Sequence, residues 1–251
     1  MSISVEEIKK AYSEDKQEAD KSEWFAYYVI RPVSFYFTML FIKFDVTANK
    51  ITWLSLFMAL LGSVLIGFGS YAIQLIGGLL LIGWLILDHV DGNVARYTNT
   101  QCSYGDFLDT IAGYIMLATF PLALGIAAYF EYNGRAYDYW FIIFGGLAAV
   151  FNILPRLMYQ KFLNYGVHGE NYRKIFGASD ETRPVSFVEM AFKLVNNLLN
   201  PSGFLLIILF LVIAVELIGS FLVLYATINF MIVVVTIVKL SRHFTSQTKS
   251  I

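Results

Sequence analysis

Four aspartates lie close together in the sequence, in two pairs on either side of a short polar connection. Asp88 and Asp91 are three residues apart, and Asp106 and Asp109 repeat this spacing. Residues three apart on a helix share a face, so each pair would present two carboxylates in one direction. Carboxylate oxygens are the ligands that hard divalent cations prefer. The pattern therefore predicts a binding site for Mg²⁺ or Mn²⁺.

The residues between the two pairs favour a bound ligand over ordinary solvated helix ends. Arg96 is the only lysine or arginine between positions 88 and 109, so a divalent cation is the natural counter-charge for the carboxylates. Gly92 and Ala95 have little side chain, which would let a base or a pyrophosphate approach the helix. For Asp106 alone we expect a capping role, because Ser103 lies three residues before it in a capping-box pattern.

The segments that would position these aspartates are long and apolar. The chain is 57% hydrophobic and only 15% charged, a balance typical of membrane proteins. We expect an all-α integral membrane fold, because backbone groups in lipid need hydrogen-bond partners within their own segment. The sequence predicts six transmembrane helices, at about residues 51–69, 71–90, 107–130, 139–159, 202–218 and 219–240.

The aromatic stretch 24–44 is predicted to be an interfacial helix rather than a seventh span. It contains Arg31 and Pro32 near its middle, and an arginine at mid-bilayer costs at least ~2.5 kcal/mol. The chain then divides into a cytosolic N-terminal segment with this helix, residues 1–44, and a six-helix catalytic domain, residues 45–245.

The distribution of basic residues predicts the orientation in the membrane. With six spans, 17 of the 18 lysines and arginines fall on one side, and only Arg135 falls on the other. Basic residues accumulate on the cytoplasmic side. Both termini and the aspartates are therefore predicted to be cytoplasmic. The net charge of -1 gives no field that would favour nucleic acid.

The segment resembles the CDP-alcohol phosphotransferase (CDP-alcohol phosphatidyltransferase) family, whose pattern is D-x2-D-G-x2-A-R-x8-G-x3-D-x3-D. Seven of its eight fixed positions are filled with the correct spacing, by Asp88, Asp91, Gly92, Ala95, Arg96, Gly105 and Asp109. Upstream, Thr47-Ala48-Asn49-Lys50-Ile51-Thr52 is similar to the T-P-N-x-I-T that members often carry before their first span.

The resemblance implies a reaction and a set of roles. Family members have six transmembrane helices and are usually homodimers. In their reaction, an acceptor hydroxyl attacks a CDP-linked donor at the surface of the lipid membrane, and CMP is released. Asp88, Asp91 and Asp109 would be the metal ligands. The CDP pocket would be formed by Gly92, Ala95 and Arg96, with Gly105 as a further fixed position and Asn49 and Thr52 as weaker candidates.

The eighth position of the pattern departs from the family. The fourth aspartate, which in the family is the general base and a metal ligand, is replaced by Gly113. Asp109 and Asp106 are then the catalytic candidates in the motif, and His168 or Glu170 would be other sources of a base. Alternatively, the acceptor needs less activation, the site uses one metal fewer, or the protein is weakly active or inactive. Loss of a general base typically costs about 10²–10⁴-fold in rate.

Three functions are therefore compared. The preferred one is a transferase, with either CDP-diacylglycerol or a small CDP-alcohol as the donor; the missing aspartate argues slightly against a housekeeping phospholipid synthase. The second is a degenerate family member that acts as a membrane scaffold or binds lipid. A transporter is the third, and it is disfavoured because the charged residues after position 50 lie near the ends of the spans.

Overall fold

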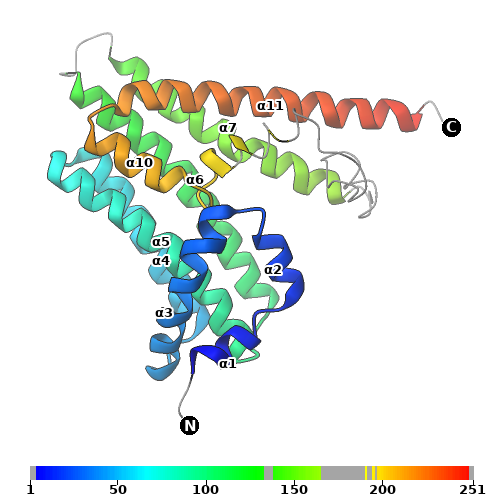
Figure 1. The fold of residues 1–251 in the computed structure, drawn as a ribbon. Helices are drawn as coiled ribbons and strands as arrows, with labels where there is room; N and C mark the ends of the chain where they lie inside the picture. Colours follow the sequence, from blue (N-terminus) through cyan, green and yellow to red (C-terminus); the bar gives the residue numbers. More distant parts are fainter. Residues whose placement is uncertain (1–3, 133–137, 165–189, 191–193, 196, 249–251) are drawn as a thin grey trace.

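The computed structural model describes residues 4–132, 138–164, 190, 194–195 and 197–248 (Figure 1). These residues form helices joined by short connections, and no strand occurs among them. The elements in chain order are α1 (Val5–Lys10), α2 (Glu14–Asp20), the π-helix η1 (Ala26–Ile30), α3 (Arg31–Lys43), α4 (Ala48–Phe68), α5 (Tyr71–Tyr97), α6 (Ser103–Glu131), α7 (Tyr139–Asn164), α10 (Leu205–Ala214) and α11 (Ile218–Thr248).

Five helices are long and apolar enough to cross a membrane: α4, α5, α6, α7 and α11. They coincide with five of the six predicted spans, so the prediction of an all-α fold with helices that could cross a membrane is confirmed. The fifth predicted span, 202–218, corresponds to α10, which has ten residues. A helix of ten residues is about 15 Å long, half the thickness of the hydrocarbon core. The number of six spans therefore stays a prediction.

Helix α4 is the central support of the site, because it packs against both α5 and α6. Where α4 crosses α5, each of the two helices has a glycine at the point of contact. A Cβ atom added at Gly62 would lie 2.9 Å from the Gly77 carbonyl oxygen, and one added at Gly77 would lie 2.6 Å from the Gly62 carbonyl oxygen. The backbones therefore approach closely, as small residues allow in membrane helix pairs.

Helices α6 and α7 are held together in the same way. A Cβ atom at Gly145 would lie 2.7 Å from the Pro121 carbonyl oxygen and 3.1 Å from the Cα atom of Gly125. A large apolar core, which includes Trp84, Met116 and Tyr225, fills the space between the helices. These contacts fix α5 and α6 on their common neighbour α4, and they therefore fix the aspartates that α5 and α6 carry.

The N-terminal helices gather beside one end of α5 (Figure 1). A capping box between Ser4 and Glu7 starts α1, and α1 packs on α3, which in turn packs along α5. Arg31 begins α3 and is buried among protein atoms, with 4% of its surface exposed. The prediction considered only the cost of placing the Arg31 side chain in lipid. In the structure this side chain has protein partners instead. The placement of residues 24–44 at a membrane interface and the division at residue 45 stay predictions.

Candidate active site

The aspartates of α5 and α6 meet between these two helices. Asp88 on α5 and Asp109 on α6 line the same cavity, and their carboxylates lie close enough to influence each other's charge. Asp91, one turn after Asp88, is buried and accepts a 2.6 Å hydrogen bond from the hydroxyl of Thr52 on α4. Asp88 and Asp91 are one turn apart on α5, but Asp88 lines one cavity and Asp91 another, and Asp109 of α6 lines both.

A first cavity, of about 130 Å³, lies between α4, α5 and the start of α6. We call it the Arg96 cavity. It brings together every residue predicted for the CDP pocket, together with three of the four aspartates. Its lining includes Asn49, Thr52, Asp91, Gly92, Ala95, Arg96, Gly105, Asp106 and Asp109. Asp88 lines a different cavity.

Two glycines of the motif shape the Arg96 cavity. A Cβ atom at Gly92 would lie 3.2 Å and 3.3 Å from the two terminal nitrogens of Arg96. Glycine therefore leaves room for the guanidinium to lie against the helix. At Gly105 a Cβ atom would lie 3.4 Å from the Asn49 side-chain oxygen. The sequence predicted that small residues expose the backbone to a ligand; at Gly92 the structure fills this space with Arg96.

The capping role expected of Asp106 is wrong. Helix α6 begins at Ser103, its N-cap residue is Cys102, and no side-chain hydrogen bond caps it. The amide of Asp106 donates to the Cys102 carbonyl oxygen at 3.2 Å, as the first turn of the helix requires. Since Ser103 already lies inside the helix, its hydroxyl is not in the N-cap position. The Asp106 side chain is exposed in the Arg96 cavity.

A second cavity, of about 250 Å³, lies next to Asp88 and Asp109. We call it the Gly113 cavity. A Cβ atom added at Gly113 would meet no atom within 4 Å, so the missing aspartate leaves open space. Asp109 is shared with the Arg96 cavity. Other lining residues are Trp84, Asp88, Thr110, Tyr114, Leu117, Arg156, Asn200, Pro201 and Ser202.

Glu23 contacts a residue that lines the Gly113 cavity, and it is not among the residues that the sequence predicts for the site. Its carboxylate accepts a 3.2 Å hydrogen bond from the side chain of Asn200, which lines this cavity. Burial raises the pKa of Glu23, and the negative charge of Asp20 raises it further. The contact joins residues 177 positions apart, and Glu23 stands in a polar stretch with no motif around it, so no sequence signal indicated it.

The carboxylates fit a divalent cation. Among the described residues no lysine or arginine forms an ion pair with Asp88, Asp91 or Asp109, although Asp88 and Asp109 line the same cavity. No group of three His, Cys, Asp or Glu side chains in the described part of the chain is close enough to hold a metal by itself. Mg²⁺ usually takes one or two carboxylates and completes its shell with water and substrate phosphates, which suits this pair.

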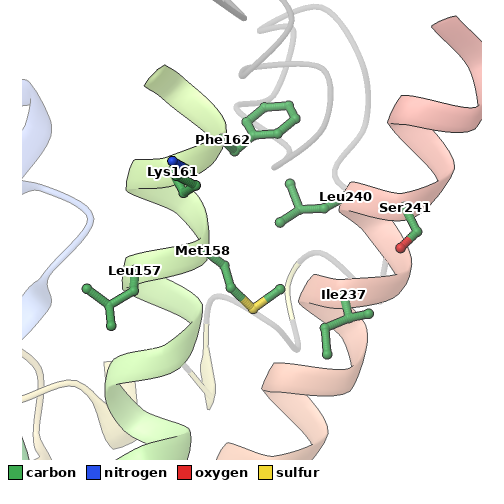
Figure 2. Close-up of a pocket in the computed structure, with 7 residues that line it drawn as sticks. All are labelled: Leu157, Met158, Lys161, Phe162, Ile237, Leu240 and Ser241. Carbon is green, nitrogen blue, oxygen red and sulfur yellow. The ribbon is translucent and has the colours of Figure 1, made fainter. Parts of the chain in front are cut away.

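Two further base candidates, His168 and Glu170, lie outside the described residues. A third cavity, of about 430 Å³, lies between α7 and α11, away from the aspartates. Figure 2 shows Met158 and Leu240 extending from the two helices into this space. Its lining is mostly apolar and contains none of the predicted site residues.

Comparison with known proteins agrees with this geometry. Residues 45–238 match the CDP-alcohol phosphatidyltransferase family. A CDP-diacylglycerol–serine O-phosphatidyltransferase of Helicobacter pylori (strain ATCC 700392 / 26695) is 42% identical over 81 residues, which are 30% of this chain. The match spans a third (33%) of that relative's length. Since the family match covers most of the chain and includes all the residues of both aspartate pairs, the chain belongs to the CDP-alcohol phosphatidyltransferase family.

Proposed function

We propose that the protein is a metal-dependent membrane transferase that moves a phosphatidyl group, or another phosphoalcohol, from a CDP-linked donor to an acceptor hydroxyl. The observation that carries the proposal is the position of Asp109, which lines both the Arg96 cavity and the Gly113 cavity. A donor bound in one cavity and an acceptor bound in the other would meet at the carboxylate pair.

The residues of the Arg96 cavity would bind the nucleotide part of the donor. Arg96 supplies a guanidinium, which binds phosphate oxygens through several N–H groups. Asn49 supplies a side-chain amide beside Gly105. Asp88 and Asp109 would hold Mg²⁺ or Mn²⁺ together with the donor's phosphates, and Asp91, which lines the Arg96 cavity, stays the proposed third ligand. The bound cation would neutralise the diphosphate and make CMP a better leaving group.

The Gly113 cavity would hold the acceptor. A bond forms between the acceptor oxygen and the donor phosphorus, the bond from this phosphorus to CMP breaks, and the hydroxyl proton passes to a base. Asp109 is our candidate base, because it is a carboxylate that both cavities share. Asp106 lines only the Arg96 cavity, so it lies on the donor's side.

The choice between donors follows from the relative. The Helicobacter protein is named for the transfer of a phosphatidyl group from CDP-diacylglycerol to serine. We therefore propose CDP-diacylglycerol as the donor and a small polar alcohol such as serine as the acceptor. Arg156 in the Gly113 cavity would bind the acceptor's carboxylate or phosphate. A small CDP-alcohol as donor is the alternative.

The proposal includes an orientation and an assembly. The charge distribution supports cytoplasmic termini and a cytoplasmic site, since 17 of 18 basic residues fall on one side of six spans. Membership of the family supports a homodimer. A non-catalytic scaffold or lipid-binding protein is the second candidate, and the observation that favours it is that Gly113 stands where the family has its fourth aspartate.

The proposal is tested by measuring CMP release. Purified protein in detergent would be given CDP-diacylglycerol, Mn²⁺ and a panel of acceptors that includes serine, inositol and glycerol phosphate. We expect one acceptor to drive CMP release, and Asp91→Asn to reduce it at least about 100-fold. Asp45→Asn is the matched control, because Asp45 is exposed, lines neither cavity and has a positive φ that asparagine tolerates. Absence of CMP with every acceptor would favour the non-catalytic candidate.

A further inference from the structure

Arg96, the arginine of the motif, is held by a chain of polar contacts from the N-terminal helices. Its terminal nitrogen donates a 2.8 Å hydrogen bond to the side-chain oxygen of Asn93. Arg31 donates to the same oxygen at 3.1 Å. The Asn93 side-chain oxygen on α5 therefore accepts hydrogen bonds from two guanidiniums. One belongs to α5 itself and the other to the start of α3.

The amide of Asn93 has its orientation fixed by α3. Its nitrogen donates to the hydroxyl of Ser34 at 3.0 Å and to the hydroxyl of Thr38 at 3.2 Å. Rotating this amide by half a turn would place N–H groups against two guanidiniums, which have no acceptor atoms. The contacts therefore define a single orientation, in which the oxygen faces Arg31 and Arg96.

Two positive groups at one oxygen repel each other unless one of them is compensated. Asp20 at the end of α2 provides this compensation, because it forms a buried ion pair with Arg31. The hydroxyl of Tyr12 donates to Asp20 at 2.7 Å, and Lys16 lies 3.0 Å from the other oxygen of Asp20. Asp20 therefore neutralises Arg31 and leaves Arg96 without a carboxylate partner among the described residues.

Arg96 consequently faces the Arg96 cavity as an oriented cation. Its Nε atom is buried without a hydrogen-bond partner in the described part of the chain. The residues that orient it from outside α5, namely Tyr12, Asp20, Arg31, Ser34 and Thr38, all precede position 45, where the family match begins. The family match alone therefore does not account for the position of this guanidinium.

We propose that Arg31 is a positioning residue of the donor site, and that helices α1 to α3 form part of that site by holding Asn93 and Arg96 for the donor's diphosphate. This inference rests on the proposed function, in that it takes the ligand of the Arg96 cavity to be a CDP group. A guanidinium that is already held in place binds an anion more tightly than a mobile one, because binding then costs less conformational entropy.

The test is a double-mutant comparison of CDP binding. Asp20→Asn and Arg31→Gln are made together, so that neither buried charge is left alone. Binding of CDP with Mn²⁺ is measured by calorimetry on the full-length protein, first with Arg96 present and then in an Arg96→Gln background. We expect the paired change to weaken binding about tenfold when Arg96 is present and to have no further effect in the Arg96→Gln background.

One control and one further variant separate this positioning role from a general effect on the fold. Lys43→Gln removes an exposed cation from the other end of α3 and should leave CDP affinity unchanged. Ser34→Ala with Thr38→Val loosens Asn93 without changing any charge, and it should weaken CDP binding about threefold. This second variant provides the test if the Asp20 and Arg31 variant does not fold.

The outcomes are distinct. Unchanged CDP affinity in the variants would contradict the inference, and so would an equal loss with and without Arg96, which would show a general effect on the fold. A wild-type protein that binds no CDP would contradict the proposed function itself, and the inference with it.

Discussion

Thr52 of α4 and Asp91 of α5 are joined by a 2.6 Å hydrogen bond between the threonine hydroxyl and the aspartate carboxylate. The bond connects two motifs that lie 39 residues apart in the sequence. Thr52 is itself anchored, because its hydroxyl also lies 3.2 Å from the carbonyl oxygen of Ala48. The upstream motif therefore supports the aspartate motif by fixing the position of one carboxylate.

Thr52→Val should lower CMP release about tenfold, because a hydrogen bond to a charged group typically contributes about 1.5–3 kcal/mol. Valine has nearly the same shape as threonine, so the packing of α4 on α5 should be kept. The rate is compared with that of Thr227→Val, an exposed position on α11 whose hydroxyl bonds only its own helix at 2.8 Å. Equal rates for the two variants would show that this bond has no part in the reaction.

Gly113→Asp restores the family's fourth aspartate in a place where the structure has room for it. We expect the variant to fold and to change either the rate of CMP release or the preferred acceptor, because the new carboxylate enters the Gly113 cavity. Gly113→Ala is the control, since a methyl group fits the same space without adding a charge. If Gly113→Asp and Gly113→Ala have the same kinetics for every acceptor, the open space at Gly113 has no role in the reaction.

Removal of divalent metal should abolish CMP release reversibly. After treatment with EDTA the activity is expected to return on addition of Mg²⁺ or Mn²⁺, because Asp88 and Asp109 line one cavity and no lysine or arginine of the described residues forms an ion pair with them. Asp88→Asn should raise the Mn²⁺ concentration needed for half-maximal activity by about tenfold. Full activity in EDTA would exclude the metal from the mechanism.

The stability of the protein should depend on the charge of Asp20. Burial by itself raises the pKa of Asp20, but the hydrogen bond from Tyr12 and the charges of Arg31 and Lys16 outweigh this effect and hold it below the usual 3.8. A carboxylate with a lowered pKa in the folded state stabilises the fold above its ordinary pKa and loses this contribution as the pH falls through the lowered value.

Thermal unfolding in detergent between about pH 6 and pH 3 measures this contribution. The wild type should lose stability toward the acid end, and Asp20→Asn should show a smaller loss over the same range. At pH 6 the variant itself should be less stable by about 3–5 kcal/mol, because Arg31 is left buried without its partner. Identical pH profiles for the two proteins would contradict the assignment.

The sequence predicted those parts of the site that follow from local spacing. The helical period places Asp88 and Asp91 one turn apart on α5, and the residues of the CDP pocket meet because α4, α5 and α6 follow one another with short turns. The five long apolar helices also followed from composition. These features need no knowledge of how distant segments pack.

The parts that were missed depend on contacts between distant segments. The pairing of Arg31 with Asn93 spans 62 residues, and that of Glu23 with Asn200 spans 177. Neither contact leaves a periodic or compositional signal. Arg31 was compared only with lipid and water as surroundings, whereas the fold offers it a buried carboxylate. The capping pattern at Ser103 failed for a local reason, since the helix begins one residue earlier than such a cap requires.

The proposed function requires that carboxylates from α5 and α6 hold a cation against the donor's diphosphate. Calorimetric measurement of CDP binding with and without Mn²⁺ tests this requirement directly. The wild type should bind CDP at least about tenfold more tightly with Mn²⁺, and Asp88→Asn combined with Asp109→Asn should remove this difference. CDP binding that is the same with and without Mn²⁺ in the wild type, or a metal effect that survives in the double variant, would contradict the account.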